Sequence, residues 1–179
     1  MLRRLTCAIF LGLAGFIGGC ATNSEPSFST RNAQVELDLH SAVRGQSNEL
    51  LGMTQQLQTY AKQGFKAPQK LTRELDNTAS QIDQIQMNIP TLLAAQDVEI
   101  SDLRQEVRNG TTSKADLKTR KMQVSIYRTA LLASLNASAT RTAATLDALR
   151  GTRLNNQKLR MHALDNDLKA VRSMIELQM

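Results

Sequence analysis

The chain has 179 residues, a formal net charge of +6, 3% aromatic side chains and no tryptophan. A chain of this length is typical of one domain, and so few aromatic residues disfavour a β-rich fold or a deep globular core. Alanine, leucine, glutamine and arginine, which favour helices, are abundant instead. The composition therefore predicts an all-α fold, an elongated antiparallel helical bundle or coiled coil with three to four long helices.

The first twenty residues have the layout of an export signal. Met1–Arg4 form a positively charged start, and residues 5–17 are apolar and almost uncharged. This run is shorter than the roughly 20 apolar residues that cross a bilayer. Small residues then lead directly to Cys20. Such a layout is typical of a secretory signal peptide.

The segment Ile17-Gly18-Gly19-Cys20 resembles the lipobox of bacterial lipoproteins, an aliphatic residue and two small residues before a cysteine. The resemblance implies cleavage between Gly19 and Cys20, and attachment of an S-diacylglycerol and an N-acyl group such as palmitate to Cys20. In double-membrane bacteria an aspartate after the cysteine tends to retain such proteins at the inner membrane, whereas this chain has Ala21. The resemblance therefore implies an outer-membrane lipoprotein that faces the periplasm. The alternatives are an ordinary secreted protein with a cysteine near its cleavage site, or an uncleaved membrane anchor.

Three segments are expected along the chain. Residues 1–19 are the signal peptide, residues 20–31 are a lipidated flexible tether, and residues 32–179 are the helical periplasmic domain. Cys7 would leave with the signal peptide, so the mature chain would hold one cysteine and no disulfide. No cofactor is expected besides the acyl groups.

The first helix is expected over residues 32–63. Its apolar residues recur at alternating steps of four and three, the pattern of a coiled-coil stripe. Gly64 and Pro68 then end the helix, because glycine favours the left-handed C-terminal conformation and proline cannot continue a helix. The stripe consists of Leu39, Val43, Gln46, Leu50, Met53, Leu57 and Tyr60.

The second helix is expected over residues 69–108 and carries two apolar stripes. The stripes change phase by one step close to Pro90, which removes one backbone hydrogen bond. We expect a kink at Pro90 rather than a full break. The first stripe is Leu71, Leu75, Thr78, Ile82, Ile85, Ile89 and Leu92, and the second is Leu93, Gln96, Ile100, Leu103 and Val107.

The strongest turn signal of the chain is Asn109-Gly110. Ser113 followed by Asp116 resembles a capping box in which aspartate replaces the usual Glu or Gln, so the third helix is expected to start near Lys114. Its stripe is loose at first and becomes regular later. The stripe consists of Leu117, Val124, Leu131, Leu132, Leu135, Ala139, Thr142, Leu146 and Leu149.

Two arrangements are open at Arg150-Gly151-Thr152, where the stripe shifts by one residue. The third helix either continues with a skip, leaving an apolar seam for a partner, or ends at Gly151 with Thr152 capping a fourth helix. A turn here would complete an up-down-up-down four-helix bundle. The stripe after this point is Leu154, Gln157, Met161, Leu164, Leu168, Val171 and Ile175.

Five polar residues interrupt the apolar stripes. Buried amides in such seams set the register and the number of partners of a coiled coil. The other interpretation is that these residues face water at loosely packed layers. They are Gln46, Thr78, Gln96, Thr142 and Gln157.

No motif for catalysis is visible in the sequence. His40 and His162 are the two histidines, and neither has a ligand-type neighbour at metal-binding spacing, so both are expected at the surface and no metal site is expected. Asp97 and Glu99 are two residues apart, which places them on different helix faces. We therefore expect a protein that is not an enzyme.

Charge is distributed unevenly along the chain. Residues 21–100 contain 6 Lys or Arg against 9 Asp or Glu, whereas residues 101–179 contain 14 against 7. The basic half would either meet an anionic surface or simply solvate its helix faces. The candidates for contact with an anionic surface surround the turn at Gly110: Arg108, Lys114, Lys118, Arg120 and Lys121.

These observations predict a lipid-anchored scaffold or adaptor at the cell envelope, such as an accessory of an envelope or secretion complex. Its partners would be the membrane, through the lipid anchor, and a helical protein or a second copy of the chain. The alternative function is binding of anionic envelope polymers (lipopolysaccharide, peptidoglycan or acidic lipid) through the basic half. Nucleic acid is not an expected partner, because an exported chain without a recognition motif has no means of reading it.

Overall fold

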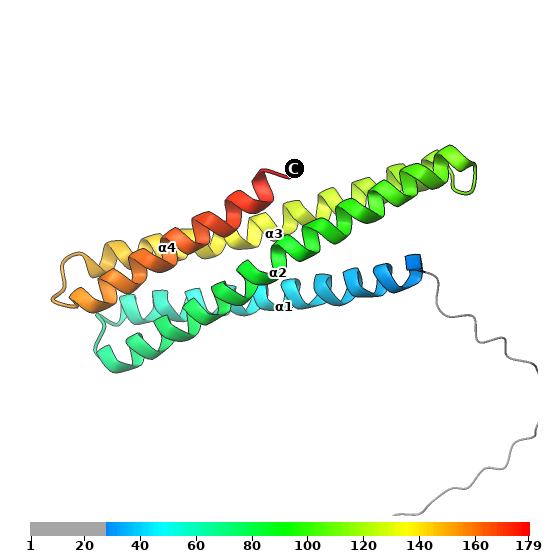
Figure 1. Ribbon diagram of the computed structural model, residues 1–179. Coiled ribbons are helices and arrows are strands. Elements are labelled where there is room, and N and C mark those ends of the chain that lie inside the picture. Colours follow the sequence, from blue (N-terminus) through cyan, green and yellow to red (C-terminus); the bar gives the residue numbers. More distant parts are fainter. Residues whose placement is uncertain (1–27) are drawn as a thin grey trace, which may run out of the picture.

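The computed structural model describes residues 28–179, with side chains from Glu36 onward, and consists of four helices joined by short turns (Figure 1). The all-α fold is thereby confirmed, and no strand is present in this part of the chain. The signal peptide and the expected acylation site at Cys20 lie outside the described residues. The helices are α1 (Phe28–Lys62), α2 (Pro68–Asn109), α3 (Lys114–Leu149) and α4 (Asn155–Glu176).

The helices form an elongated up-down-up-down bundle. α1 and α4 lie on opposite sides, each in contact with both α2 and α3, and α1 does not touch α4. Because successive helices alternate in direction, α1 and α3 run parallel, and the α2–α3 turn lies at the end where α1 begins (Figure 1). Because α4 has 22 residues against 42 in α2, the α2–α3 hairpin extends beyond it.

The predicted stripe of α1 is confirmed at its core. Val43, Leu50 and Leu57, spaced by seven residues, are fully buried. The helix begins at Phe28, so the last four residues of the expected tether are helical. It ends at Lys62, one residue before the predicted end, and Gly64 with its positive φ of 66° lets the chain turn.

α2 is one unbroken helix through Pro90. The first predicted stripe is buried throughout, whereas the second is buried only as far as Ile100, and Leu103 and Val107 are half-buried. Pro68 occupies the first turn, where its missing N–H has no helical partner to lose.

At the C-terminal end of α2, Gly110 has a φ of 76°. The backbone N–H groups of Gly110 and Thr111 donate hydrogen bonds to the carbonyls of Val107 and Glu106 in the last turn of the helix.

The cap predicted for α3 is confirmed. The Ser113 hydroxyl oxygen accepts a hydrogen bond from the Asp116 backbone N–H at 3.1 Å, and the hydroxyl donates to the Asp116 carboxylate at 2.6 Å. The carboxylate thus binds the hydroxyl rather than the Ser113 backbone N–H of a true capping box.

The structure decides between the two arrangements at Gly151 in favour of a turn. Gly151 does not adopt a left-handed conformation, and Leu154 rather than Thr152 is the N-cap of α4. The Thr152 hydroxyl instead donates to the Leu149 carbonyl at 2.8 Å and accepts from the Leu154 N–H at 3.3 Å. The chain therefore reverses, and the apolar stripe of α4 packs into the shared core: Met161, Leu164, Leu168, Val171 and Ile175.

Thr78, Gln96 and Thr142 are buried, which excludes the interpretation that they face water. The Thr78 hydroxyl donates to the Glu74 carbonyl of its own helix at 2.6 Å, whereas the Thr142 hydroxyl has no hydrogen-bond partner among the described residues. These two threonines therefore tolerate burial without linking helices, and their small side chains allow close helix approach.

The two glutamines at the stripe edges do link helices. The Asn88 amide of α2 donates to the Gln46 side-chain oxygen of α1 at 3.2 Å, and the Gln157 amide of α4 donates to the Thr72 hydroxyl of α2 at 2.9 Å. Both glutamines are half-buried. Such cross-helix bonds favour one register of the bundle over its neighbours.

Candidate functional site

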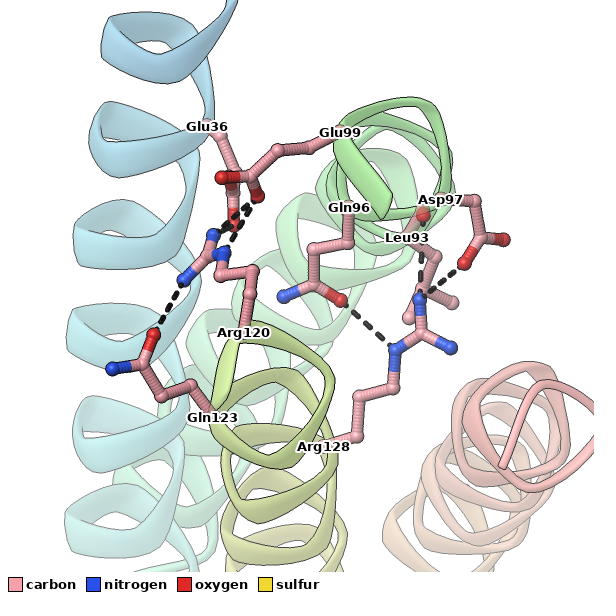
Figure 2. A network of polar contacts seen from close by, with 8 residues as sticks. All are labelled: Glu36, Leu93, Gln96, Asp97, Glu99, Arg120, Gln123 and Arg128. Atoms are coloured by element: carbon pink, nitrogen blue, oxygen red, sulfur yellow. Dashed lines mark hydrogen bonds and ion pairs between the residues drawn. The ribbon is translucent and has the colours of Figure 1, made fainter. Parts of the chain in front are cut away.

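A part-buried ion triad joins three helices in the half of the bundle that contains the start of α1 (Figure 2). The Arg120 guanidinium of α3 lies 2.5 Å from the Glu36 carboxylate of α1 and 2.6 Å from the Glu99 carboxylate of α2. Glu36 is only 4% exposed. One guanidinium therefore holds carboxylates from two other helices, a geometry that fits the planar fork of arginine.

The triad has two carboxylates for one cation, and this imbalance affects Glu36. Burial raises the pKa of Glu36 to about 7, and its contact with Glu99 adds to the increase, while Arg120 opposes it. Glu36 thus exchanges a proton near neutral pH, unlike an ordinary carboxylic acid.

His40 and Tyr127 stack beside the triad, with their ring centroids 3.5 Å apart. The Tyr127 hydroxyl donates to the His40 carbonyl at 3.2 Å, and burial raises the pKa of Tyr127 to about 12. Burial, then Arg44 and Arg120, lower the pKa of His40. His162 is exposed as expected, but His40 is half-buried because it packs between α1 and α3.

A buried arginine, Arg128, joins α3 to α2 and to the residues after α4. Arg128 is 6% exposed and donates to the Gln96 amide oxygen at 2.9 Å, the Asp97 carboxylate at 2.8 Å and the Leu93 carbonyl at 3.4 Å (Figure 2). It also donates to the Gln178 carbonyl at 2.6 Å. Its charge is therefore compensated by acceptors from two directions, as a buried cation requires.

The sequence contains one charged stripe residue for each ion cluster, around Arg120 and around Arg128, and our prediction missed both. Glu36 lies seven residues before Val43, in the heptad position that is otherwise apolar in α1. Arg128 lies four residues after Val124 and three before Leu131 in the stripe of α3. In each cluster a charged residue occupies a position of the apolar stripe and indicates burial of that charge. The local sequence does not identify its partners, because they lie on other helices.

Four of the five basic residues predicted to contact an anionic surface are exposed around the α2–α3 turn. Arg120 is the exception, because its guanidinium points inward to the triad. The other four make no ion pair with described residues, and they alternate with the carboxylates Asp102, Glu106 and Asp116. The four are Arg108, Lys114, Lys118 and Lys121.

The described residues contain no cluster of His, Cys, Asp or Glu that could hold a metal ion. No helix in residues 28–179 combines the length and the apolar character needed to cross a membrane. No family model, curated protein or solved structure matches this chain. The predicted cleavage and lipid sites, Gly19 and Cys20, lie outside the described residues.

Proposed function

We propose that this chain is a lipid-anchored, non-enzymatic scaffold or adaptor, held at the outer membrane by acylated Cys20 and facing the periplasm. The observation that carries the proposal is the rod formed by the four helices. α2 alone has 42 residues, which at 1.5 Å per residue makes it about 63 Å long. A rod of this kind offers long helix faces to a helical partner or to a second copy of the chain.

The position of α1 supports an attachment at one end of the rod. Phe28 lies eight residues, or about 12 Å of helix, before Glu36, and Lys114 lies six residues, or about 9 Å, before Arg120. Because α1 and α3 are parallel and Glu36 contacts Arg120, the chain enters the bundle at the same end of the rod as the α2–α3 turn (Figure 1). We call this the anchored end.

Replacement of Cys20 tests the proposal. The Cys20→Ser chain should leave the membrane fraction or remain an uncleaved precursor, because it cannot be acylated. Cys7→Ser is the matched control, since this cysteine lies inside the expected signal peptide and should not affect retention. Normal membrane retention and processing of Cys20→Ser would refute the anchoring proposal.

The second candidate function is binding of anionic envelope polymers at the anchored end. It is supported by the exposure of Arg108, Lys114, Lys118 and Lys121 without ion-pair partners among the described residues. Binding of lipopolysaccharide or peptidoglycan should then weaken with salt and with replacement of these four residues by Gln. Binding that is unaffected by the replacements would exclude this candidate.

A further inference from the structure

The end of the rod opposite the anchored end is formed by two turns that are distant in the sequence. The turn at residues 63–67 joins α1 to α2, and the turn at residues 150–154 joins α3 to α4 (Figure 1). The Gln157–Thr72 hydrogen bond of 2.9 Å holds the start of α4 against the start of α2. We call this the distal end.

The distal end carries a concentration of uncompensated positive charge. Its carboxylates Asp76 and Asp147 already form ion pairs with Arg160 and Arg150. The half-buried Glu74 is then the remaining carboxylate near the five basic residues below. Five further basic side chains are exposed and make no hydrogen bond or ion pair with described residues. They are Lys62, Lys66, Lys70, Arg73 and Arg153.

The anchored end is less positive by comparison. Its exposed basic residues alternate with Asp102, Glu106 and Asp116, and Arg120 is neutralised by the triad. Residues 21–100 have a negative net charge, although four of their six basic residues lie close together within residues 62–73. Folding places these four residues beside the basic residues of the turn at 150–154.

We propose that the distal end binds a bilayer surface bearing anionic phospholipid headgroups. The cations are distributed around two turns at the tip of the rod, an arrangement that matches charges spread over a plane. Each basic side chain close to an anionic membrane strengthens binding about five-fold, because it contributes about 1 kcal/mol. Together with the proposed anchor, on which this consequence alone rests, the rod spans two membranes.

Vesicle binding by the mature chain, residues 20–179 carrying Cys20→Ser, tests the distal surface independently of acylation and of the apolar signal segment. The probes are vesicles of phosphatidylcholine with and without phosphatidylglycerol, and sedimentation measures binding. We expect binding only with phosphatidylglycerol, and loss of binding at high salt. The distal variant, Lys62, Lys66, Lys70 and Arg73 each replaced by Gln, should bind at least about ten-fold more weakly.

A variant of equal charge change at the anchored end is the matched control. It replaces Arg108, Lys114, Lys118 and Lys121 by Gln, and it should retain most of the binding. The proposal is overturned if both variants lose binding equally, if phosphatidylcholine alone binds as well, or if soluble polyglutamate binds as tightly as the vesicles. Binding through the distal end with an unmodified Cys20 in cells would refute the anchor but not this surface.

Discussion

At the scale of single residues, Glu36 makes the stability of the bundle depend on pH. Burial raises the pKa of this carboxyl from 4.5 to about 7, so the native state binds its proton more tightly than the unfolded chain does. The resulting stabilisation is complete below about pH 4.5 and is lost as the pH rises through 7. It amounts to about 3 kcal/mol at most, since one unit of pKa corresponds to about 1.4 kcal/mol.

Glu36→Gln should remove this dependence, because the amide stays uncharged at every pH. We expect the difference in free energy of unfolding between pH 5 and pH 8, measured by urea denaturation, to be smaller in the variant than in the parent chain. Glu176→Gln, at an exposed position on α4, serves as the control and should keep the parent pH profile. A parent-like profile in Glu36→Gln would show that burial does not control this carboxyl.

Arg128 contributes through four hydrogen bonds that join α3 to α2 and to the residues after α4. Truncation to Ala removes its bonds to Gln96, Asp97 and two backbone carbonyls. Because unsatisfied buried polar groups are costly, Arg128→Ala should lower the free energy of unfolding by about 3 kcal/mol. Arg150→Ala, whose side chain is 75% exposed, should change it by less than about 0.5 kcal/mol. Equal effects in urea titrations would contradict the proposed network.

At the scale of elements, two glycines in open space should respond in opposite directions to the same substitution. Gly110 has a φ of 76°, so Gly110→Ala should destabilise the protein by about 1 kcal/mol. Gly45 lies in the interior of α1, so Gly45→Ala should stabilise it by up to about 1 kcal/mol. Nothing lies within 4 Å of an added Cβ at either position. Thermal unfolding distinguishes the two, and a loss of stability in both variants would contradict the assignment of Gly45.

The helices were largely predictable because their information is local. The heptad of Val43, Leu50 and Leu57 depends only on spacing, and Gly64 and Gly110 mark turns through their backbone freedom. The start of α1 was less accessible, since residues that favour the N-cap position occur at Ser27, Ser29, Thr30 and Asn32 and offer several possible helix starts. The turn at Gly151 could not be decided in advance, because a skip and a reversal leave the same apolar stripe.

At the scale of the whole molecule, the sequence was a poor guide to which charges meet. Glu36 and Arg120 are 84 residues apart, and no local pattern links them. The distal end was missed for the same reason, because Lys66 and Arg153 belong to halves of opposite net charge. Only the order and direction of the four helices show that one end of the rod is more basic than the other.

The whole molecule is a rod with a buried apolar core, an anchored end where α1 begins, and a distal end rich in unpaired cations. The length of the rod sets how far the proposed scaffold extends from the membrane. The proposed lipid group sets which end of the rod is attached there. Without acylation at Cys20 only the distal end would bind a membrane, and the anchored end would have no attachment. The proposed function therefore depends first on the lipid attachment at Cys20.

Mass spectrometry of the N-terminal peptide, on the mature protein purified from membranes of the cells that produce it, decides whether this attachment exists. We expect a chain that begins at Cys20 and carries the mass of a diacylglycerol on its sulfur and an acyl group on its amine. A chain that retains residues 1–19, or one with an unmodified Cys20 thiol, would contradict the proposed anchor.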